Sequence, residues 1–224
     1  VKFHDHDWTE LHPFAEEAID ETGPEPKTEP IQITVFTDAN HGTDLVTRRS
    51  TTRILIFVLG ALIKHYSKGQ NTVESSTYSS ELVAMRLSIE QLLGIRYKLR
   101  MMGIAVAPTS TILSDNQSVA TNMQLPSSTL KKKHNSVAFH KVREAIACKI
   151  ARVGFIRSDQ NPADVGTKCL GPSDMYKLCG PILYNRFELD NNKPSRKINV
   201  MRRTNLEDAL RFQLTHNTQE RGKE

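Results

Sequence analysis

The sequence predicts an α/β fold with a mixed five-stranded sheet and helices on its faces. Three strand patterns follow one another within residues 31–67, where apolar residues alternate with polar ones or form short runs. Helical patterns then alternate with two further strand patterns up to residue 178. The resulting order, β-β-β-α-β-α-α-β-α, places a meander of strands before the alternating elements and therefore favours one mixed sheet.

The first three strands form the meander. The first runs from Ile31 to Asp38, because apolar residues at alternate positions are separated by polar ones. Residues 40–42 turn the chain before a long apolar run, 54–63, which Gly60 interrupts. That run is about half as long as a membrane-spanning helix needs to be. It therefore indicates two buried strands and a turn, over residues 53–59 and 62–67.

The helical patterns come next. Ser79 or Ser80 is suited to cap the start of the first and longest helix. Pro162 favours a helix start, because the first helical position needs no backbone N–H. The remaining predicted elements are a helix over 77–102, a strand over 109–113, helices over 116–123 and 131–146, a strand over 152–156 and a helix over 162–178.

Composition and charge divide the chain into three predicted regions. Residues 1–30 hold nine acidic and two basic side chains and end in a proline-rich stretch, so we expect an acidic lead-in and an extended linker. Residues 31–180 hold ten acidic and 19 basic side chains and carry the predicted domain. Residues 181–224 are expected to form a polar, basic and loosely ordered tail, with one helix near 206–214. The basic domain favours a polyanionic partner.

Several other features restrict the function. Three cysteines are an odd number without CxxC spacing, which argues against a disulfide framework or a zinc knuckle. The first residues are polar, so we expect no signal peptide and an intracellular protein, in a cytoplasmic particle or the nucleus, that is not secreted. Apolar residues recur every three to four positions from Trp8 to Ala18. This spacing suggests a short amphipathic helix or a docking segment.

Four acidic residues of the basic domain fall at the ends of predicted elements. Asp38 closes the first strand and Asp115 follows the fourth. Glu81 lies in the first turns of the long helix, and Asp164 lies in the first turn of the last one. Ligand sites of α/β sheets form where strand ends and helix starts meet at one rim. We therefore expect these four carboxylates to share one site.

A cluster of four carboxylates is electrostatically costly. Two unit charges about 5 Å apart repel by roughly 3 kcal/mol at an effective dielectric constant of about 20. Divalent cations offset such repulsion, and oxygen ligands without Cys or His favour Mg²⁺ or Mn²⁺. Two such ions about 4 Å apart can activate a water and stabilise a leaving alkoxide at a phosphodiester. The alternative is structural, because a strand-end Asp can simply be solvated and Asp164 can favour a helix N-terminus.

Short motifs recur along the chain in a characteristic order. They are FTDANH (36–41), TRRST (47–51), SKGQNTVESST (67–77), SELVA (80–84), RYKLR (96–100), SDNQS (114–118), LKKKH (130–134), HKVREA (140–145) and ADVGTK (163–168). As a set they resemble the ribonuclease H domain at the C-terminal end of copia-type (pseudoviral) LTR-retrotransposon Pol polyproteins. The likeness covers roughly residues 1–180, including the acidic lead-in.

The resemblance implies a ribonuclease H-like fold in which Asp38, Glu81, Asp115 and Asp164 are the catalytic and metal-binding residues. It also implies two Mg²⁺ ions, with Mn²⁺ as an alternative. The implied reaction is hydrolysis of the RNA strand of RNA–DNA hybrids during reverse transcription, which leaves a 3′-hydroxyl and a 5′-phosphate. The implied partners are the hybrid and the polymerase part of the same polyprotein, and no membrane.

Substrate contacts are expected around this site. Asn116 and Gln117 look like residues that touch the hybrid, since amide side chains can hydrogen-bond base edges and 2′-hydroxyls in a wide minor groove. Basic side chains would meet the phosphates, although ordinary solvated positions are the alternative for each. The expected basic contacts are Arg48, Arg49, Lys131, Lys132, Lys133, His134 and Arg143.

Two other functions compete with hybrid cleavage. A decayed tether or nucleic-acid-binding module could keep the fold without activity, although all four carboxylates are present here. An integrase- or transposase-type nuclease of the same broad fold places its essential glutamate after both aspartates. Here Glu81 lies between Asp38 and Asp115, and this order argues against that class.

Overall fold

The computed structural model describes residues 1, 3, 5–130, 132–180 and 182. The chain divides into two compact units, Val1–Cys169 and Leu170–Glu224. The predicted tail lies outside the described residues apart from Ile182, and the predicted domain boundaries stay predictions. Among the described residues, no helix combines the length and the apolar character that crossing a membrane requires.

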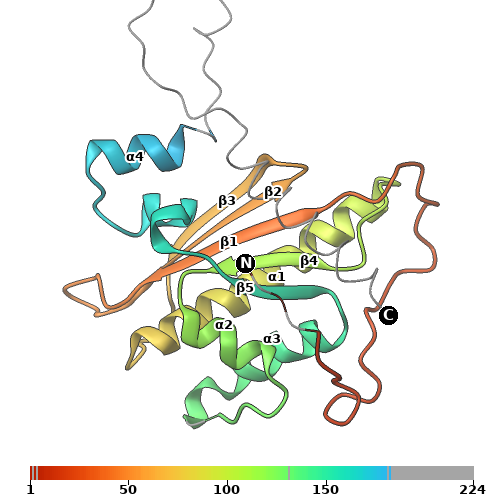
Figure 1. The fold of residues 1–224 in the computed structure, drawn as a ribbon, viewed down its shortest axis with the longest axis horizontal. Helices are drawn as coiled ribbons and strands as arrows, with labels where there is room; N and C mark the ends of the chain where they lie inside the picture. Colours follow the sequence, from red (N-terminus) through yellow and green to blue (C-terminus); the bar gives the residue numbers. More distant parts are fainter. Residues whose placement is uncertain (2, 4, 131, 181, 183–224) are drawn as a thin grey trace, which may run out of the picture. The chain divides into compact units, whose positions relative to one another are not determined.

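Five strands of the described residues form one mixed sheet in the order β3-β2-β1-β4-β5 (Figure 1). Antiparallel pairing joins β1 to β2 and β2 to β3, whereas β4 and β5 continue the sheet in parallel with β1. The arrangement confirms the predicted fold class. The strands are β1 (Ile33–Asn40), β2 (Thr51–Val58), β3 (Ala61–Gly69), β4 (Ser110–Ser114) and β5 (Ala151–Phe155).

Three helices lie together on one side of this sheet (Figure 1). They are α1 (Thr77–Met101), α2 (Gln117–Gln124) and α3 (Ser136–Ala147). Strand residues at alternate positions, such as Val35, Ile56 and Ile112, share one buried cluster with helix residues such as Met85 and Val142. Removing this apolar surface from water is the main force that fixes the helices on the sheet, at about 25 cal/mol per Å².

The long helix α1 begins at Thr77 as predicted, but its serine cap is Ser76 and not Ser79 or Ser80. The side-chain oxygen of Ser76 accepts a hydrogen bond of 3.3 Å from the backbone N–H of Ser79. Ser79 and Ser80 themselves are fully buried in the first turn. The predicted cap is therefore wrong in position, although the type of residue and the resulting helix are right.

The prediction of one last helix over residues 162–178 is wrong. The segment forms a short 3-10 helix, η3 (Pro162–Gly166), followed by a separate helix, α4 (Pro172–Cys179). The side-chain oxygen of Asn161 caps η3 by accepting a hydrogen bond of 3.2 Å from Ala163 N–H. Pro172 lacks a backbone N–H and its ring would clash with the preceding turn, so one continuous helix could not pass through it.

Part of the lead-in packs against the sheet-and-helix body within the unit Val1–Cys169. Trp8 is buried, and the guanidinium of Arg143 from α3 lies 5.0 Å from the centre of its ring. Two hydrogen bonds to Trp8 O, from the N–H groups of Leu11 and His12, close a turn there. The segment therefore docks as expected, but through turns and without the amphipathic helix that its spacing suggested.

A carboxylate of the lead-in forms ion pairs with two arginines of α1. Glu17 Oε2 lies 2.6 Å from Arg96 Nη2 and 2.7 Å from Arg100 Nη2. The side chain of Arg96 is fully buried, and its Nη1 also donates to Ala107 O at 2.9 Å. Burial acts to raise the pKa of Glu17, but the hydrogen bonds from both arginines outweigh it and lower that pKa to about 2. A buried cation is thus paired with an anion from a distant segment.

Candidate active site

Strand register places the first two carboxylates side by side. The strands β1 and β4 are parallel neighbours, and Thr37 pairs with Ser114. Asp38 and Asp115 directly follow these two residues, so they lie side by side near the carboxyl ends of adjacent parallel strands, although β1 continues to Asn40 and Asp38 does not close it as expected. This is the rim at which ligand sites of such sheets form.

The other two carboxylates reach the same rim from helical segments. Glu81, near the start of α1, accepts a hydrogen bond of 3.3 Å at Oε1 from Ala39 N–H. Asp164 lies in η3, which Asn161 ties to β1 by donating a bond of 3.2 Å from Nδ2 to Thr37 O. One oxygen each of Asp38, Glu81 and Asp115 lies within 4.8 Å of the others.

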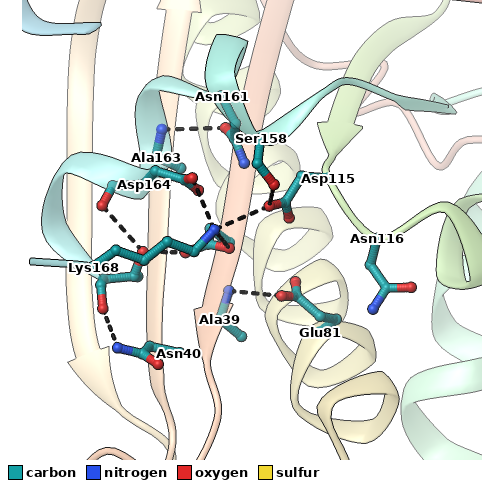
Figure 2. Close-up of polar contacts among 12 residues, drawn as sticks. Ala39, Asn40, Glu81, Asp115, Asn116, Ser158, Asn161, Ala163, Asp164 and Lys168 are labelled. Atoms are coloured by element: carbon teal, nitrogen blue, oxygen red, sulfur yellow. Dashed lines mark hydrogen bonds and ion pairs between the residues drawn. The ribbon is translucent and has the colours of Figure 1, made fainter. Parts of the chain in front are cut away.

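An ammonium group lies among these carboxylates. Lys168 Nζ is 2.8 Å from Asp164 Oδ2, 3.1 Å from Asp115 Oδ2 and 3.7 Å from Asp38 Oδ1. Figure 2 shows Lys168 extending toward the carboxylates of Asp164 and Asp115, with Glu81 entering from α1. All four predicted carboxylates are therefore brought together, and Lys168 joins three of them.

The pKa values follow from burial in this crowded site. Asp38 and Glu81 are 1% and 3% exposed. Burial, and then the nearby charges of Asp38 and Asp115, raise the pKa of Glu81 to about 9. Burial likewise raises the pKa of Asp38, and it raises that of Asp164 to about 6 in spite of the bond from Lys168. Without a bound cation, burial and mutual repulsion therefore disfavour the state in which all of these carboxylates are charged.

The donor set suits divalent cations such as Mg²⁺. Glu81 Oε2 and Asp164 Oδ1 are buried and have no hydrogen-bond partner among the described residues. A buried acceptor without a partner costs roughly 1–3 kcal/mol, so these two unpaired oxygens favour a bound cation at the site. Every side chain of the cluster except Lys168 offers carboxylate oxygens, the ligands that hard cations prefer.

Sequence reasoning assigned no role to the side chains that surround the four carboxylates. Thr167 Oγ1 donates a short hydrogen bond to Asp38 Oδ2, and Ser158 Oγ donates one to Asp115 Oδ2. Asn40 Nδ2 donates to Thr167 O, which ties η3 to the end of β1. The ADVGTK motif (163–168) contained Thr167 and Lys168, but it did not show which groups they would contact.

The two amides expected at the substrate have different positions. Asn116 caps α2, where its Oδ1 accepts a hydrogen bond of 3.1 Å from Val119 N–H. Gln117 is exposed and lines a cavity of about 730 Å³ together with Thr121, Gln124 and Arg157. Asn116 is thus engaged as a helix cap, whereas the exposed Gln117 lines a cavity.

The lysine-rich segment lies near the start of α1. Lys132 Nζ bonds Ser75 Oγ at 3.2 Å and Ser76 Oγ at 3.1 Å. His134 Nε2 lies 3.7 Å from Glu74 Oε2. Lys132, Lys133 and His134 are exposed, and Lys131 lies outside the described residues.

The three predicted arginines are placed differently. Arg143 is buried, and it donates to Ser128 O at 2.6 Å and to Pro126 O. The expected role of Arg143 as a substrate contact does not fit this placement, because internal partners occupy its guanidinium. Arg48 and Arg49 are exposed on the loop between β1 and β2, where Arg48 N–H donates to Asp44 O at 2.7 Å.

Sheet order, strand directions and the acidic rim together define a ribonuclease H-like fold with a candidate metal site. No family model matches the chain. The chain is 28% identical over 144 residues to the retrovirus-related Pol polyprotein from transposon TNT 1-94 of Nicotiana tabacum. The match covers 64% of this chain but only 11% of that polyprotein.

Solved structures similar to this chain are ribonuclease H domains. The N-terminal RNase H domain of rv2228c from Mycobacterium tuberculosis has a TM-score of 0.48 at 8% identity, covering 66% of this chain and 96% of that one. LC11-RNase H1, solved in complex with an RNA/DNA hybrid, has a TM-score of 0.48 at 17% identity, covering 60% and 93%. RNase H1 from Halobacterium salinarum has a TM-score of 0.46 at 7% identity, covering 59% and 90%. The fold assignment rests on the strand order of the sheet itself.

Proposed function

We propose that this chain is the ribonuclease H domain of a copia-type retrotransposon polyprotein. Its activity would be endonucleolytic hydrolysis of the RNA strand of RNA–DNA hybrids during reverse transcription. The observation that carries the proposal is the convergence of Asp38, Glu81, Asp115 and Asp164 on one rim of the sheet. Similarity to the tobacco polyprotein supports the retrotransposon context.

The four carboxylates would hold two divalent cations, Mg²⁺ or alternatively Mn²⁺. When bound, such ions polarise a phosphoryl oxygen and lower the pKa of a water molecule. The fold supplies rigidity, because Ala39 N–H orients Glu81 and Thr167 Oγ1 orients Asp38. In the overall reaction, water oxygen bonds to phosphorus while the bond from phosphorus to the 3′-oxygen breaks. That oxygen takes a proton and becomes the 3′-hydroxyl.

Substrate would approach over the exposed polar groups near the rim. Gln117 and the neighbouring cavity are placed to meet the hybrid, as are Lys132 and Lys133 near the start of α1. A surface that carries Lys and Arg binds the phosphate backbone by releasing counterions, so binding should weaken with salt. The polymerase part of the same polyprotein would be the covalent partner. An intracellular place of action, in a cytoplasmic particle or the nucleus, follows from the same proposal.

The test is a cleavage assay with labelled RNA annealed to DNA. In Mg²⁺ the purified chain should cut the RNA strand and leave the DNA strand intact, and EDTA should reduce cleavage to background. The same RNA as a single strand and as an RNA duplex serves as control. A well-folded chain that binds the hybrid but never cleaves it, in Mg²⁺ or Mn²⁺, would instead support the decayed binding module.

A further inference from the structure

The side chain of Lys168 lies in direct contact with several carboxylates of the site. Its ammonium lies within 4 Å of oxygens from three acidic residues on three different elements. These residues are Asp38 on β1, Asp115 after β4 and Asp164 in η3. One positive group thus bridges the parts of the chain that form the rim.

The backbone around Lys168 is fixed independently of its ammonium. Lys168 N–H donates a hydrogen bond of 3.0 Å to Asp164 O, and Thr167 N–H donates one of 3.2 Å to the same oxygen. Asn40 Nδ2 holds Thr167 O, and Thr167 Oγ1 holds Asp38. The side chain is therefore directed into the cluster from a fixed base, yet it is 38% exposed and has space to leave.

The oxygens that Lys168 contacts are the ones a divalent cation would need. Asp115 Oδ2 and Asp164 Oδ2 are its two hydrogen-bond acceptors. Glu81 Oε2 and Asp164 Oδ1 remain without partners among the described residues, so one monovalent cation satisfies the cluster only in part. An ammonium and a metal ion bound to the same oxygens share their lone pairs and lie close enough for their positive charges to repel each other, so each weakens binding of the other.

We propose that Lys168 is a built-in cation that occupies part of the acidic site and competes with a divalent metal ion for the oxygens of Asp115 and Asp164. This inference rests on the proposed function, because it requires that the cluster binds such ions. The ammonium stabilises the cluster when no metal is bound. Metal binding displaces it toward solvent, so Lys168 lowers the metal affinity of the site and limits occupancy at low metal concentration.

The experiment compares Mn²⁺ and Mg²⁺ binding to the wild-type chain and to Lys168→Met, by calorimetry and by the paramagnetic resonance signal of free Mn²⁺. Removing the ammonium should tighten binding of the first ion about tenfold. A unit positive charge this close to the ion repels it strongly enough to lower its binding constant by at least that factor. Thermal unfolding without metal should occur at a lower temperature in the variant, and Mg²⁺ should raise its midpoint more than that of the wild type.

Two variants serve as controls. Lys141→Met removes a lysine with a similarly exposed side chain, 41% against 38%, whose Nζ pairs with Glu144 at 3.1 Å on the surface of α3. It should leave metal affinity unchanged. Lys168→Arg keeps the charge and should retain the weaker wild-type affinity. Where Lys168→Met fails to fold, Lys168→Gln removes the same charge with a polar side chain and should show the same tighter binding of the first ion.

The outcomes separate the two proposals. Tighter binding in Lys168→Met alone supports the built-in cation. Equal or weaker binding in that variant overturns it but leaves the metal-dependent function standing, and so does an affinity of Lys168→Arg as high as that of Lys168→Met. If neither the wild type nor Lys168→Met binds either ion, the metal site of the proposed function fails and the competition fails with it.

Discussion

Replacement of Asp115 by Asn is expected to lower Mg²⁺-dependent cleavage of the RNA strand by about 10³-fold, because a metal ion contributes several kcal/mol to such a transition state. Asn has nearly the same size and shape as Asp, so this substitution removes the charge of Asp115 with little change in volume. Initial rates of hybrid cleavage at saturating Mg²⁺ measure the effect. An amide carries no charge and binds hard cations more weakly than a carboxylate.

The same variant should remain folded. Removing one negative charge from a crowded cluster relieves repulsion of a few kcal/mol at most, and the lost bond from Lys168 offsets part of that gain. The unfolding midpoint without metal should therefore stay near that of the wild type. Asp174→Asn, on the exposed first turn of α4, is the matched control and should cleave normally. Cleavage by Asp115→Asn at the wild-type rate would remove Asp115 from the proposed site.

Replacement of Glu17 by Gln is expected to lower the free energy of unfolding by about 3 kcal/mol, because breaking a buried ion pair leaves an unpaired charge. Glu17 accepts hydrogen bonds from both arginines. Arg96 Nε and Arg100 Nη1 each donate to its Oε1 at 2.8 Å. The neutral amide leaves the fully buried Arg96 without its counter-charge. Urea unfolding followed by circular dichroism measures the difference.

An exposed ion pair provides the control for this prediction. Arg86 and Glu90 pair one turn apart on α1, with both side chains partly in water. Such pairs contribute about 0.3–0.5 kcal/mol, so Glu90→Gln should have a much smaller effect than Glu17→Gln. Equal effects of the two substitutions would show that the lead-in is not held by Glu17.

The contribution of Glu17 should also depend on pH. Its pKa is about 2 in the folded chain against an ordinary value of 4.5, so folding favours the charged form. The stabilisation is fully present above pH 4.5 and is lost as pH falls toward 2. The charges facing Glu17 are Arg96 and Arg100, and the thiol of Cys148, also within electrostatic range, is neutral at these pH values. The stability difference between wild type and Glu17→Gln should therefore shrink between pH 5 and pH 3.

Local patterns were sufficient for most of the fold. The alternation in β1 and the apolar period of α1 depend only on residues that are close together in the sequence. The positions of these two elements could therefore be predicted to within a few residues. The last helix was not predictable in this way. The sequence offered only a helix start at Pro162, whereas the chain beyond Gly166 follows contacts of Thr167 with Asp38 and Asn40, which lie more than a hundred residues earlier.

In the candidate site too, local patterns predicted some residues, whereas the placement of others depended on tertiary contacts. Strand ends and a helix start identified Asp38, Glu81, Asp115 and Asp164, because the register of a mixed sheet brings such positions to one rim. Basic residues were harder to assign, since a positive side chain can face solvent or the interior. Arg143 lies against Trp8 inside the protein, which no local pattern could show.

The sequence by itself determined the order of the elements, the mixed sheet and the four carboxylates at its rim, because hydrophobic period and strand ends are local properties. Only the tertiary structure decided that Lys168 lies among three of those carboxylates and that Glu17 pairs with Arg96. Apart from the contact of Lys168 with Asp164, these contacts join residues that are 53 to 130 positions apart. Their energies come from charge, burial and distance in space, which a linear sequence does not specify.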